Sequence, residues 1–558
     1  MNVEPNDLPL QRAYKWEAER ANQVYMTQPM GGGAVREYTW AATLDEARRM
    51  AGHLASLGFA PGSKIAILSK NTAEFIIADL AIWMAGLVSV ALYPTLNAET
   101  VRYILDHSEA KLLFVGKLDT WDEQRVGVPA DVSCIACTLA PPTDFPKWSD
   151  IVASARPIEG SPTRELDDTA LLLYTSGSTG TAKGVEHTFR SISAMPKLVP
   201  QLLDLGGGTR FLSYLPLAHA FERAAVELAS LGIGGRVFFA ESLDTFVDDI
   251  KRARPTFFHS VPRLWLKFQL GVQAKMPEKK LRRLLRIPIL RGVVRKKILA
   301  GLGLDQTRIA ITGSAPVPPE LIEWYRRLGL ELLEGYAMSE DFLYSHLSLP
   351  GKARAGYVGH CLPGATAKLS PEGEVLLKSP GNMKGYYKEP EMTAACYTED
   401  GFFRTGDRGE YDSEGRLRIT GRVKELFKSS KGKYVAPAPI ENLLNAHEHV
   451  EMSCVTGSGL PQPIGLVQLS EALRRKLKSQ GNHRGVLGTD LAALLEQINR
   501  RVEEWERLGC LIVVREEWAI ENGFLTPTMK IKRSIIDDRY GPHFEAWAGA
   551  KQKVIWQE

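Results

Sequence analysis

Cysteine is scarce in this chain, with only six scattered over 558 residues. Such a distribution does not build a disulfide framework and favours a reducing compartment. Cys134 and Cys137 have the spacing of a redox or metal-binding pair, but they lie in an apolar, strand-like run without a second pair. We therefore expect both to be structural, and we predict no zinc site.

Long apolar runs are also missing. The longest, residues 80–93, is too short to span a bilayer and is divided by Gly86. Residues 1–17 mix acids, prolines and basic residues without an apolar core of the signal-peptide type, so we expect a cytoplasmic protein. The net charge of only +4 gives no reason to expect a nucleic-acid partner. The sequence makes no prediction about the oligomeric state.

The length indicates three or four folding units with ample material for a buried core. A capping-box pattern at Thr43 predicts a helix over residues 43–57, and strands and helices alternate after it. The expected strands are 64–68, 88–92, 111–115 and 171–174, and the expected helices are 75–85 and 98–105. This alternation predicts an α/β fold with a doubly wound parallel sheet, in which ligands bind at the carboxyl ends of the strands.

The pattern changes after about Glu340. Short strands with turn signals follow at 374–377, 401–404 and 416–419, which predicts a barrel-like or antiparallel unit. Beyond Gly421 we expect a small α+β unit.

One segment has the composition of an anion-binding loop. An apolar run ends at Tyr174, and a loop rich in hydroxyl groups and glycine follows it. Glycine lets backbone N–H groups approach an anion closely, hydroxyl groups add donors, and a lysine supplies charge. The loop residues are Thr175, Ser176, Gly177, Ser178, Thr179, Gly180 and Lys183. The Walker spacing is absent, and from these residues alone an ordinary surface turn is an equal alternative.

Several segments, in order along the chain, carry a resemblance to a known family. They are residues 174–184, 214–223, 313–316, 335–340, 401–407 and 421–428. They resemble the phosphate loop, acyl-pocket segment, adenine-site segments, ribose site and hinge of the adenylate-forming (acyl-activating, AMP-binding) superfamily. The resemblance covers the chain from about Tyr38 to Arg533. Segments 216–223, 261–264, 433–441 and 521–530 are similar to its long-chain fatty acyl-CoA synthetase branch.

This resemblance implies a domain organisation and an activity. The N-terminal domain, 1–421, would combine doubly wound α/β subdomains with a small β-barrel-like subdomain. A hinge at 422–424 would join it to a small, mobile α+β C-terminal domain, 425–558. The implied reaction is ATP-dependent activation of a medium- or long-chain fatty acid to acyl-AMP, followed by transfer to coenzyme A. ATP, Mg²⁺ and coenzyme A are therefore the implied cofactors.

The resemblance also implies which residues bind the nucleotide. The loop 175–183 would hold the β- and γ-phosphates, while Thr179 and Glu340 would help to place Mg²⁺, an ion that prefers oxygen ligands. Asp407 would accept hydrogen bonds from the ribose hydroxyls, and Arg422 would add a charged donor. The other residues of the implied nucleotide site are Gly313, Ser314, Ala315, Tyr336 and Ser339.

Further residues are implied in the chemistry and in the hinge. Lys530 matches the lysine that bridges the reacting carboxylate and the α-phosphate, with Lys532 as the alternative. Lys424 occupies the hinge position, and Lys428 would belong to the thioester-forming face. The alternative is that this stretch is only a charged surface turn. His219 would line the acyl pocket near the carboxylate, although a lone histidine in an apolar run is as readily a core residue.

A basic segment lies between residues 275 and 299. It carries ten Lys and Arg residues against one acid, Glu278, and is broken by Pro288. Apolar residues at helical spacing predict two short amphipathic helices. A peripheral contact with an anionic membrane would fit them, because each cation near such a surface contributes about 1 kcal/mol. A solvated helical pair packed on the domain is the alternative.

Other functions stay open at this point. One is a fatty acyl-AMP ligase that passes the acyl group to a carrier protein, and another is a β-lactone-forming synthetase of the same superfamily. A third is a non-catalytic basic protein that binds nucleotide or membranes. The joint presence of Lys183, Glu340, Asp407 and Lys530 argues against the third.

Overall fold

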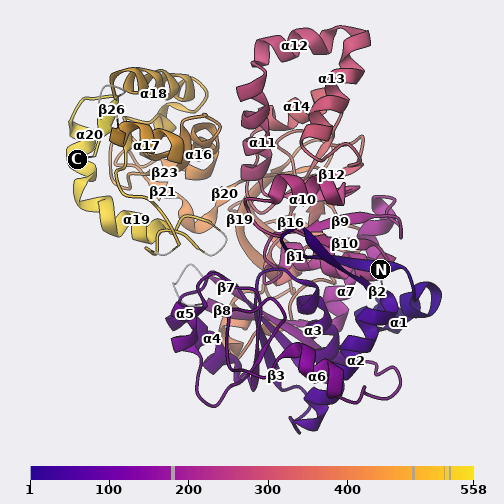
Figure 1. The fold of residues 1–558 in the computed structure, drawn as a ribbon. Coiled ribbons are helices and arrows are strands. Elements are labelled where there is room, and N and C mark those ends of the chain that lie inside the picture. Colours follow the sequence, from indigo (N-terminus) through magenta and orange to yellow (C-terminus); the bar gives the residue numbers. More distant parts are fainter. Residues whose placement is uncertain (1, 177–181, 480–483, 521, 527–528, 558) are drawn as a thin grey trace.

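The computed structural model describes residues 2–176, 182–479, 484–520, 522–526 and 529–557. A large N-terminal body and a smaller C-terminal body lie side by side (Figure 1). Among the described residues, no hydrophobic cluster mixes the two bodies: two clusters lie before residue 404 and two after residue 434. The α/β fold with a large N-terminal and a small C-terminal domain is therefore confirmed.

A seven-stranded sheet forms the base of the N-terminal body, with strand order β18-β8-β7-β4-β3-β5-β6. The strands are β3 (Lys64–Leu68), β4 (Val88–Leu92), β5 (Leu112–Val115), β6 (Ser133–Ala136), β7 (Thr169–Ser176), β8 (Ala182–Thr188) and β18 (Gly385–Tyr386). Strands β3 to β7 pair in parallel, as predicted, but β8 pairs antiparallel with both β7 and β18. Strand β8 was not predicted from the sequence; it is antiparallel because the chain after β7 returns as a hairpin.

Helices cover this sheet. They include α1 (Pro9–Arg20), α2 (Trp40–Ser56), α3 (Ala73–Met84), α4 (Ala98–Ser108), α5 (Trp121–Gln124), α6 (Trp148–Ser154) and α7 (Phe189–Leu202). Every residue of α3 is buried, as expected for an apolar helix beneath other layers. Helix α2 begins at Trp40, three residues earlier than Thr43, because Thr39 caps it by accepting a hydrogen bond from Ala42 N at 3.1 Å.

Two further sheets complete the α/β part. One has the order β2-β1-β10-β9 and consists of β1 (Val24–Gly31), β2 (Ala34–Thr39), β9 (Arg210–Ser213) and β10 (Arg236–Phe239). The other runs β11 (Phe257–Ser260), β12 (Ile309–Thr312), β13 (Leu332–Tyr336), β14 (His346–Leu347) and β15 (His360–Cys361). Between these strands lie α8 (Ala220–Glu222), the π-helical stretch η3 (Arg223–Leu228), α9 (Ala229–Ile233), α10 (Phe246–Ala253), α11 (Pro262–Lys275) and α14 (Pro319–Leu328).

The later N-terminal body is antiparallel. Strands β16 (Thr366–Leu369), β17 (Glu374–Lys378), β19 (Phe403–Tyr411) and β20 (Leu417–Arg422) form one four-stranded sheet, and α15 (Pro390–Ala395) lies between them in sequence. Strand β20 leads directly to a 3-10 turn, η5 (Val423–Glu425), where the chain enters the C-terminal body.

The C-terminal body is a small α+β unit. It contains a two-stranded sheet, β21 (Phe427–Lys428) and β22 (Tyr434–Val435), and a four-stranded one, β23 (Val450–Thr456), β24 (Ile464–Leu469), β25 (Leu511–Val513) and β26 (Val554–Trp556). Its helices are α16 (Pro437–Asn445), α17 (Glu471–Ser479), α18 (Arg484–Asn499), α19 (Arg533–Tyr540) and α20 (Phe544–Gly549).

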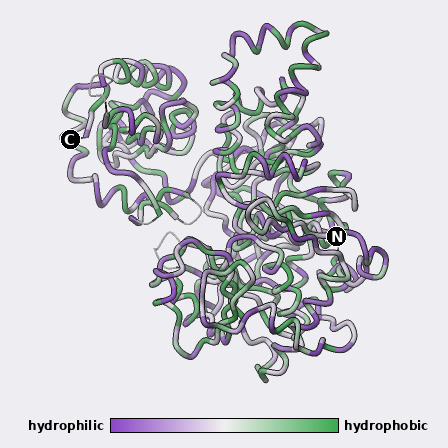
Figure 2. Tube along the Cα trace, viewed as in Figure 1, coloured by the Kyte–Doolittle hydropathy of each residue, from purple (hydrophilic) through white to green (hydrophobic). Residues whose placement is uncertain are grey.

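The basic segment forms the two predicted helices, α12 (Glu278–Arg286) and α13 (Pro288–Gly301). They project from the N-terminal body in Figure 1, and Figure 2 shows hydrophilic and hydrophobic residues intermixed along them. Within the described ranges, no helix is both long and apolar enough to cross a membrane.

His187 makes a pH-dependent contribution to the free energy of unfolding. It is fully buried in β8, where Nε2 donates to Ser339 O at 2.7 Å and Nδ1 lies 3.1 Å from Ser191 Oγ. Burial lowers the pKa of His187 to about 4. Since the unfolded chain takes up this proton near pH 6.5 and the folded chain does not, the contribution is complete above pH 6.5 and is lost as pH falls toward 4.

We predict that His187→Gln, whose amide can still donate to Ser339 O, weakens this dependence. Between pH 6.5 and 4 the unfolding free energy of the wild type should fall by up to roughly 3 kcal/mol more than that of the variant. Denaturant titrations at both pH values measure the difference. Parallel pH profiles for the two proteins would contradict the prediction.

Candidate active site

The predicted phosphate loop lies at the turn of the β7–β8 hairpin. Thr175 on β7 and Lys183 on β8 are direct partners in the strand register. Gly177, Ser178, Thr179 and Gly180 lie outside the described residues, and Ser176 is placed by its backbone only. Strand β7, which precedes these residues, ends beside the carboxyl end of the parallel strand β4.

Lys183 and Glu340 share a neighbour. The Lys183 ammonium lies 5.4 Å from the ring centroid of Tyr386, and Tyr386 OH donates to Glu340 Oε1 at 2.9 Å. Tyr386 belongs to β18, the strand that pairs with the far side of β8. The structure thus brings a cation and a carboxylate to the same end of the hairpin, an arrangement suited to phosphate oxygens and a hard metal ion.

The two adenine-site segments follow neighbouring parallel strands. Gly313, Ser314 and Ala315 come directly after β12, and Tyr336 ends β13. A Cβ on Gly313 would lie 3.3 Å from Gly335 O, which is tighter than side chains normally pack. Glycine at 313 therefore allows the two strand ends to approach. Ser339 is joined to the hairpin through the bond from His187 Nε2.

Asp407 is held at the edge of this site. It is 8% exposed and accepts from Tyr336 OH at 2.8 Å and from Arg422 Nε at 2.9 Å. Burial, followed by the Asp407 carboxylate, raises the pKa of Tyr336 well above its usual value, so the phenol stays protonated. Asp407 and Arg422 face each other across β19 and β20. The predicted adenine and ribose groups therefore form one connected cluster.

Lys530 reaches this cluster from the C-terminal body. Its backbone N–H donates to Thr526 Oγ1 at 3.0 Å. Desolvation by neighbouring protein atoms lowers the pKa of Lys530, and Arg422 lowers it further, whereas Asp407 and Glu340 oppose the shift. These interactions bring the Lys530 side chain near Arg422, Asp407 and Glu340.

His219 lies within electrostatic reach of Lys530. Its Nδ1 accepts a hydrogen bond from Phe221 N at 3.0 Å and so caps α8. Burial first, and then the Lys530 charge, lowers the pKa of His219 to about 3. The imidazole is therefore neutral near pH 7, and because Nδ1 accepts, Nε2 carries the hydrogen and can only donate.

Ion pairs join the two bodies. Arg501 Nη2 lies 2.8 Å from Glu320 Oε1, and Arg263 pairs with Glu451. Lys428 faces its own body in this arrangement, with its ammonium 5.8 Å from the ring centroid of Tyr434. The structure thus brings Lys530 toward His219 while Lys428 contacts its own domain.

Comparison with known proteins identifies the family. A model described as AMP-binding enzyme matches residues 12–387, and one described as AMP-binding enzyme C-terminal domain matches residues 425–545. The chain belongs to the AMP-binding enzyme family. The superfamily resemblance seen in the motifs is thereby confirmed.

Relatives and solved structures agree with this family. The chain is 30% identical to long-chain-fatty-acid–CoA ligase FadD15 of Mycobacterium bovis, over 96% of each chain. It is also 30% identical to human long-chain-fatty-acid–CoA ligase 1, over 86% of this chain and 79% of the relative. The adenylation domain of a carboxylate reductase from Mycobacterium chelonae superposes with a TM-score of 0.81 at 21% identity, covering 98% of this chain and 91% of that one. The anthranilate CoA ligase AuaEII gives 0.77 at 20%, covering 97% and 99%. These two structures support the fold.

Sequence reasoning missed Tyr386. It belongs to a two-residue strand 46 residues beyond Glu340, and no motif led to it. Its role as a link between Lys183 and Glu340 follows only from the pairing of β18 with β8.

Proposed function

We propose that this AMP-binding enzyme activates a medium- or long-chain fatty acid with ATP and transfers the acyl group to coenzyme A. The observation that carries the proposal is that Lys530 of the C-terminal body lies within electrostatic reach of Asp407, Glu340 and His219 of the N-terminal body. The names of the relatives that match most of the chain support the acid class and the acceptor.

The reaction needs positive charge more than acid–base groups. A carboxylate oxygen attacks the α-phosphorus of ATP, the bond to pyrophosphate breaks, and acyl-AMP forms. Two anions must meet, so Lys530 would sit between the carboxylate and the α-phosphate and stabilise the charge that develops there. His219 Nε2–H would donate to an acyl or phosphate oxygen, since its neutral ring with Nδ1 occupied cannot act as a base.

The remaining predicted residues would hold the nucleotide. Lys183 and loop 175–183 would bind the β- and γ-phosphates. Asp407 would exchange its bonds with Tyr336 and Arg422 for ribose hydroxyls. The other residues would surround the base: Gly313, Ser314, Ala315, Tyr336 and Ser339.

Magnesium fits the donor set at the hairpin. Glu340 offers a carboxylate oxygen beside Lys183 and Tyr386, and the hydroxyl of Thr179 would complete the pair named from the sequence. When bound, Mg²⁺ neutralises charge on the phosphate oxygens. The carboxylate of Glu340 is kept oriented for this by Tyr386 OH.

The domain boundaries follow the same proposal. Residues 1–421 would form the adenylation domain, 422–424 the hinge, and 425–558 the mobile domain. Lys424 lies in η5, a single exposed turn directly after β20, where a few backbone torsions suffice for rotation. After rotation, Lys428 would replace Lys530 at this site, and the CoA thiolate would attack the acyl carbonyl and displace AMP.

Lys530→Ala tests the proposal. We expect acid-dependent pyrophosphate release to fall by about a hundredfold or more, because the cation between the two anions is lost. The reaction of supplied acyl-AMP with coenzyme A should continue. Lys532→Ala is the matched control and should retain both half-reactions. Equal loss of both half-reactions in Lys530→Ala, or no acid-dependent pyrophosphate release by the wild type over a range of chain lengths, would refute it.

We also propose that the hairpin of α12 and α13 contacts the surface of an anionic membrane. Four large apolar side chains are exposed around the junction of these helices: Ile287 at 45%, Ile289 at 85%, Leu290 at 38% and Val293 at 65%. Exposed cations surround them: Lys275, Lys279, Lys280, Arg282, Arg283, Arg286, Arg291, Lys296 and Lys297. Apolar groups among cations suit the interface of an anionic bilayer, where a long-chain acid would also reside.

Vesicle sedimentation tests this contact. Neutralising Arg282, Arg283 and Arg286 with glutamine should weaken binding to phosphatidylserine vesicles by about tenfold or more, since each cation contributes about 1 kcal/mol. The control changes three exposed arginines elsewhere, Arg125, Arg475 and Arg500, and alters net charge equally. Equal effects of the two triple variants would contradict a specific contact, as would tight binding to neutral phosphatidylcholine alone.

A further inference from the structure

The turn between β9 and α8, residues 214–219, carries His219 and contains no regular element. Asn71, which lies beyond the carboxyl end of β3, holds the main chain of this turn. Its Nδ2 donates to Leu215 O at 2.5 Å, and its Oδ1 accepts from Leu217 N at 3.0 Å. Asn71 is 7% exposed, so these bonds do not compete freely with water.

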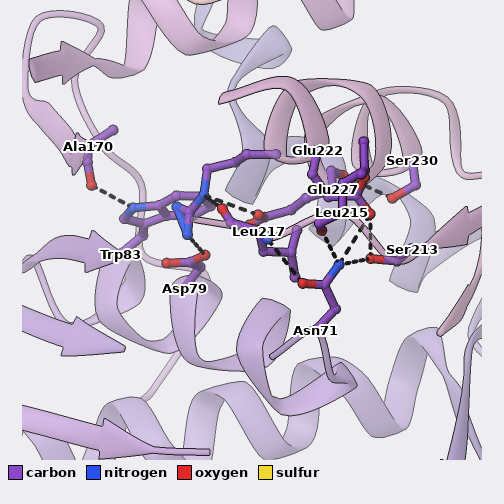
Figure 3. A network of polar contacts seen from close by, with 11 residues as sticks. Asn71, Asp79, Trp83, Ala170, Ser213, Leu215, Leu217, Glu222, Glu227 and Ser230 are labelled. Atoms are coloured by element: carbon purple, nitrogen blue, oxygen red, sulfur yellow. Dashed lines mark hydrogen bonds and ion pairs between the residues drawn. The ribbon is translucent and has the colours of Figure 1, made fainter. Parts of the chain in front are cut away.

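Glu222 holds the start of the same turn. Its Oε1 accepts from Ser213 Oγ at 2.8 Å, from Tyr214 N at 2.9 Å and from Asn71 Nδ2 at 3.2 Å. Its Oε2 lies 2.8 Å from His259 Nε2. Glu222 is fully buried, and Figure 3 shows it with Asn71 and Ser213 at the centre of these contacts. Both carboxylate oxygens are thus satisfied, and the carboxylate joins Asn71 to β9 and β11.

Arg223 anchors the end of the turn. Its Nε donates to Leu217 O at 3.1 Å, and its Nη2 donates to Asp79 Oδ2 at 2.7 Å on the buried helix α3. Glu227, one turn further along η3, lies 3.6 Å from Nε, and all three ionisable side chains are fully buried. Removing one partner of such a group leaves an uncompensated buried charge, so the helix and the turn are firmly joined.

The geometry of the turn decides where His219 points. Its Nδ1 is occupied by Phe221 N, so only Nε2 is available to a ligand. A shift of the turn by about 1 Å would move this donor out of hydrogen-bond range, and such displacements can cost about a hundredfold in rate.

We propose that Glu222 and Asn71 are positioning residues, which fix the 214–219 turn and thereby aim the Nε2–H of His219 at the reacting acid. The proposal rests on the proposed function. Their hydrogen bonds go to Ser213, to the main chain of the turn, to His259 and to each other, so both would act on His219 through the turn. The same turn would tolerate glutamine at 222, because its amide oxygen can still accept from Tyr214 N.

A double-mutant cycle tests the proposal. Glu222→Ala should lower kcat for pyrophosphate release about tenfold to a hundredfold, with KM for ATP unchanged. The double variant Glu222→Ala/His219→Ala should be no slower than His219→Ala alone, because the two residues act as one unit. Glu222→Gln should stay close to wild type. Losses that add in the double variant would overturn the proposal.

Hydrogen exchange tests whether Glu222 holds the turn without a measurement of activity. In Glu222→Ala, amides of a peptide spanning 213–220 should exchange faster while those of α4 stay protected. Ser230→Ala is the matched control: Ser230 is buried in the same region, and its Oγ donates to Glu227 O rather than to the turn. It should leave exchange and kcat unchanged. Unaltered exchange in Glu222→Ala would overturn the proposal.

Two further outcomes are distinguishable. If Glu222→Ala does not fold, Ser213→Ala is the substitute, because it removes the hydroxyl that donates to Glu222 and accepts from Asn71. Ser213→Ala should lower kcat for pyrophosphate release less than Glu222→Ala, and its loss should again be non-additive with that of His219→Ala. An additive loss would overturn the proposal. Should the wild type release no pyrophosphate with any acid, the proposed function is refuted, while exchange still decides whether Glu222 holds the turn.

Discussion

The charge of Lys530 acts across the boundary between two bodies that otherwise have separate hydrophobic cores. After burial, its ammonium further lowers the pKa of His219. The pKa of Lys530 itself is lowered by burial and by Arg422, against the opposing carboxylates of Asp407 and Glu340. These interactions of Lys530 exist only while the C-terminal body lies against the N-terminal body. The proposed chemistry therefore depends on an orientation between domains that is held by surface ion pairs such as Arg501–Glu320, each of which contributes little. Because these contacts are weak, the C-terminal body could rotate out of this orientation.

The part of the N-terminal body that carries His219 is held more firmly. Parallel strands β3, β4 and β7 end at one edge, and the buried helix α3 lies under the turn that carries His219. Asn71, Glu222 and Arg223 bind that turn through side chains that have almost no access to water. The proposed mechanism would combine this fixed turn with a movable source of charge, which suits two successive half-reactions at one site.

Much of this could be predicted from sequence, and the exceptions have physical causes. Strands 64–68 and 88–92 match to the residue, because short apolar runs between turns leave few alternatives. The start of α2 was misplaced, since Thr39 and Thr43 both fit a cap and only the hydrogen bond to Ala42 N distinguishes them. The phosphate and ribose motifs are local in sequence and were recognisable. The bonds of Asn71 and Glu222 were not, because these residues are 151 positions apart and only the tertiary fold brings them together.

The most direct test is to measure both half-reactions after the two bodies have been cross-linked in the present orientation. Arg263 and Glu451 form an ion pair across the boundary, so cysteines at both positions can be joined by a short, reducible bifunctional maleimide. The joined enzyme should form acyl-AMP and pyrophosphate in a single turnover but no acyl-CoA, and reduction should restore the thioester step. The wild type, treated in the same way, controls for its own cysteines. Formation of acyl-CoA at an undiminished rate by the joined enzyme, or loss of acyl-AMP formation, would contradict an arrangement in which Lys530 serves the first half-reaction in this orientation.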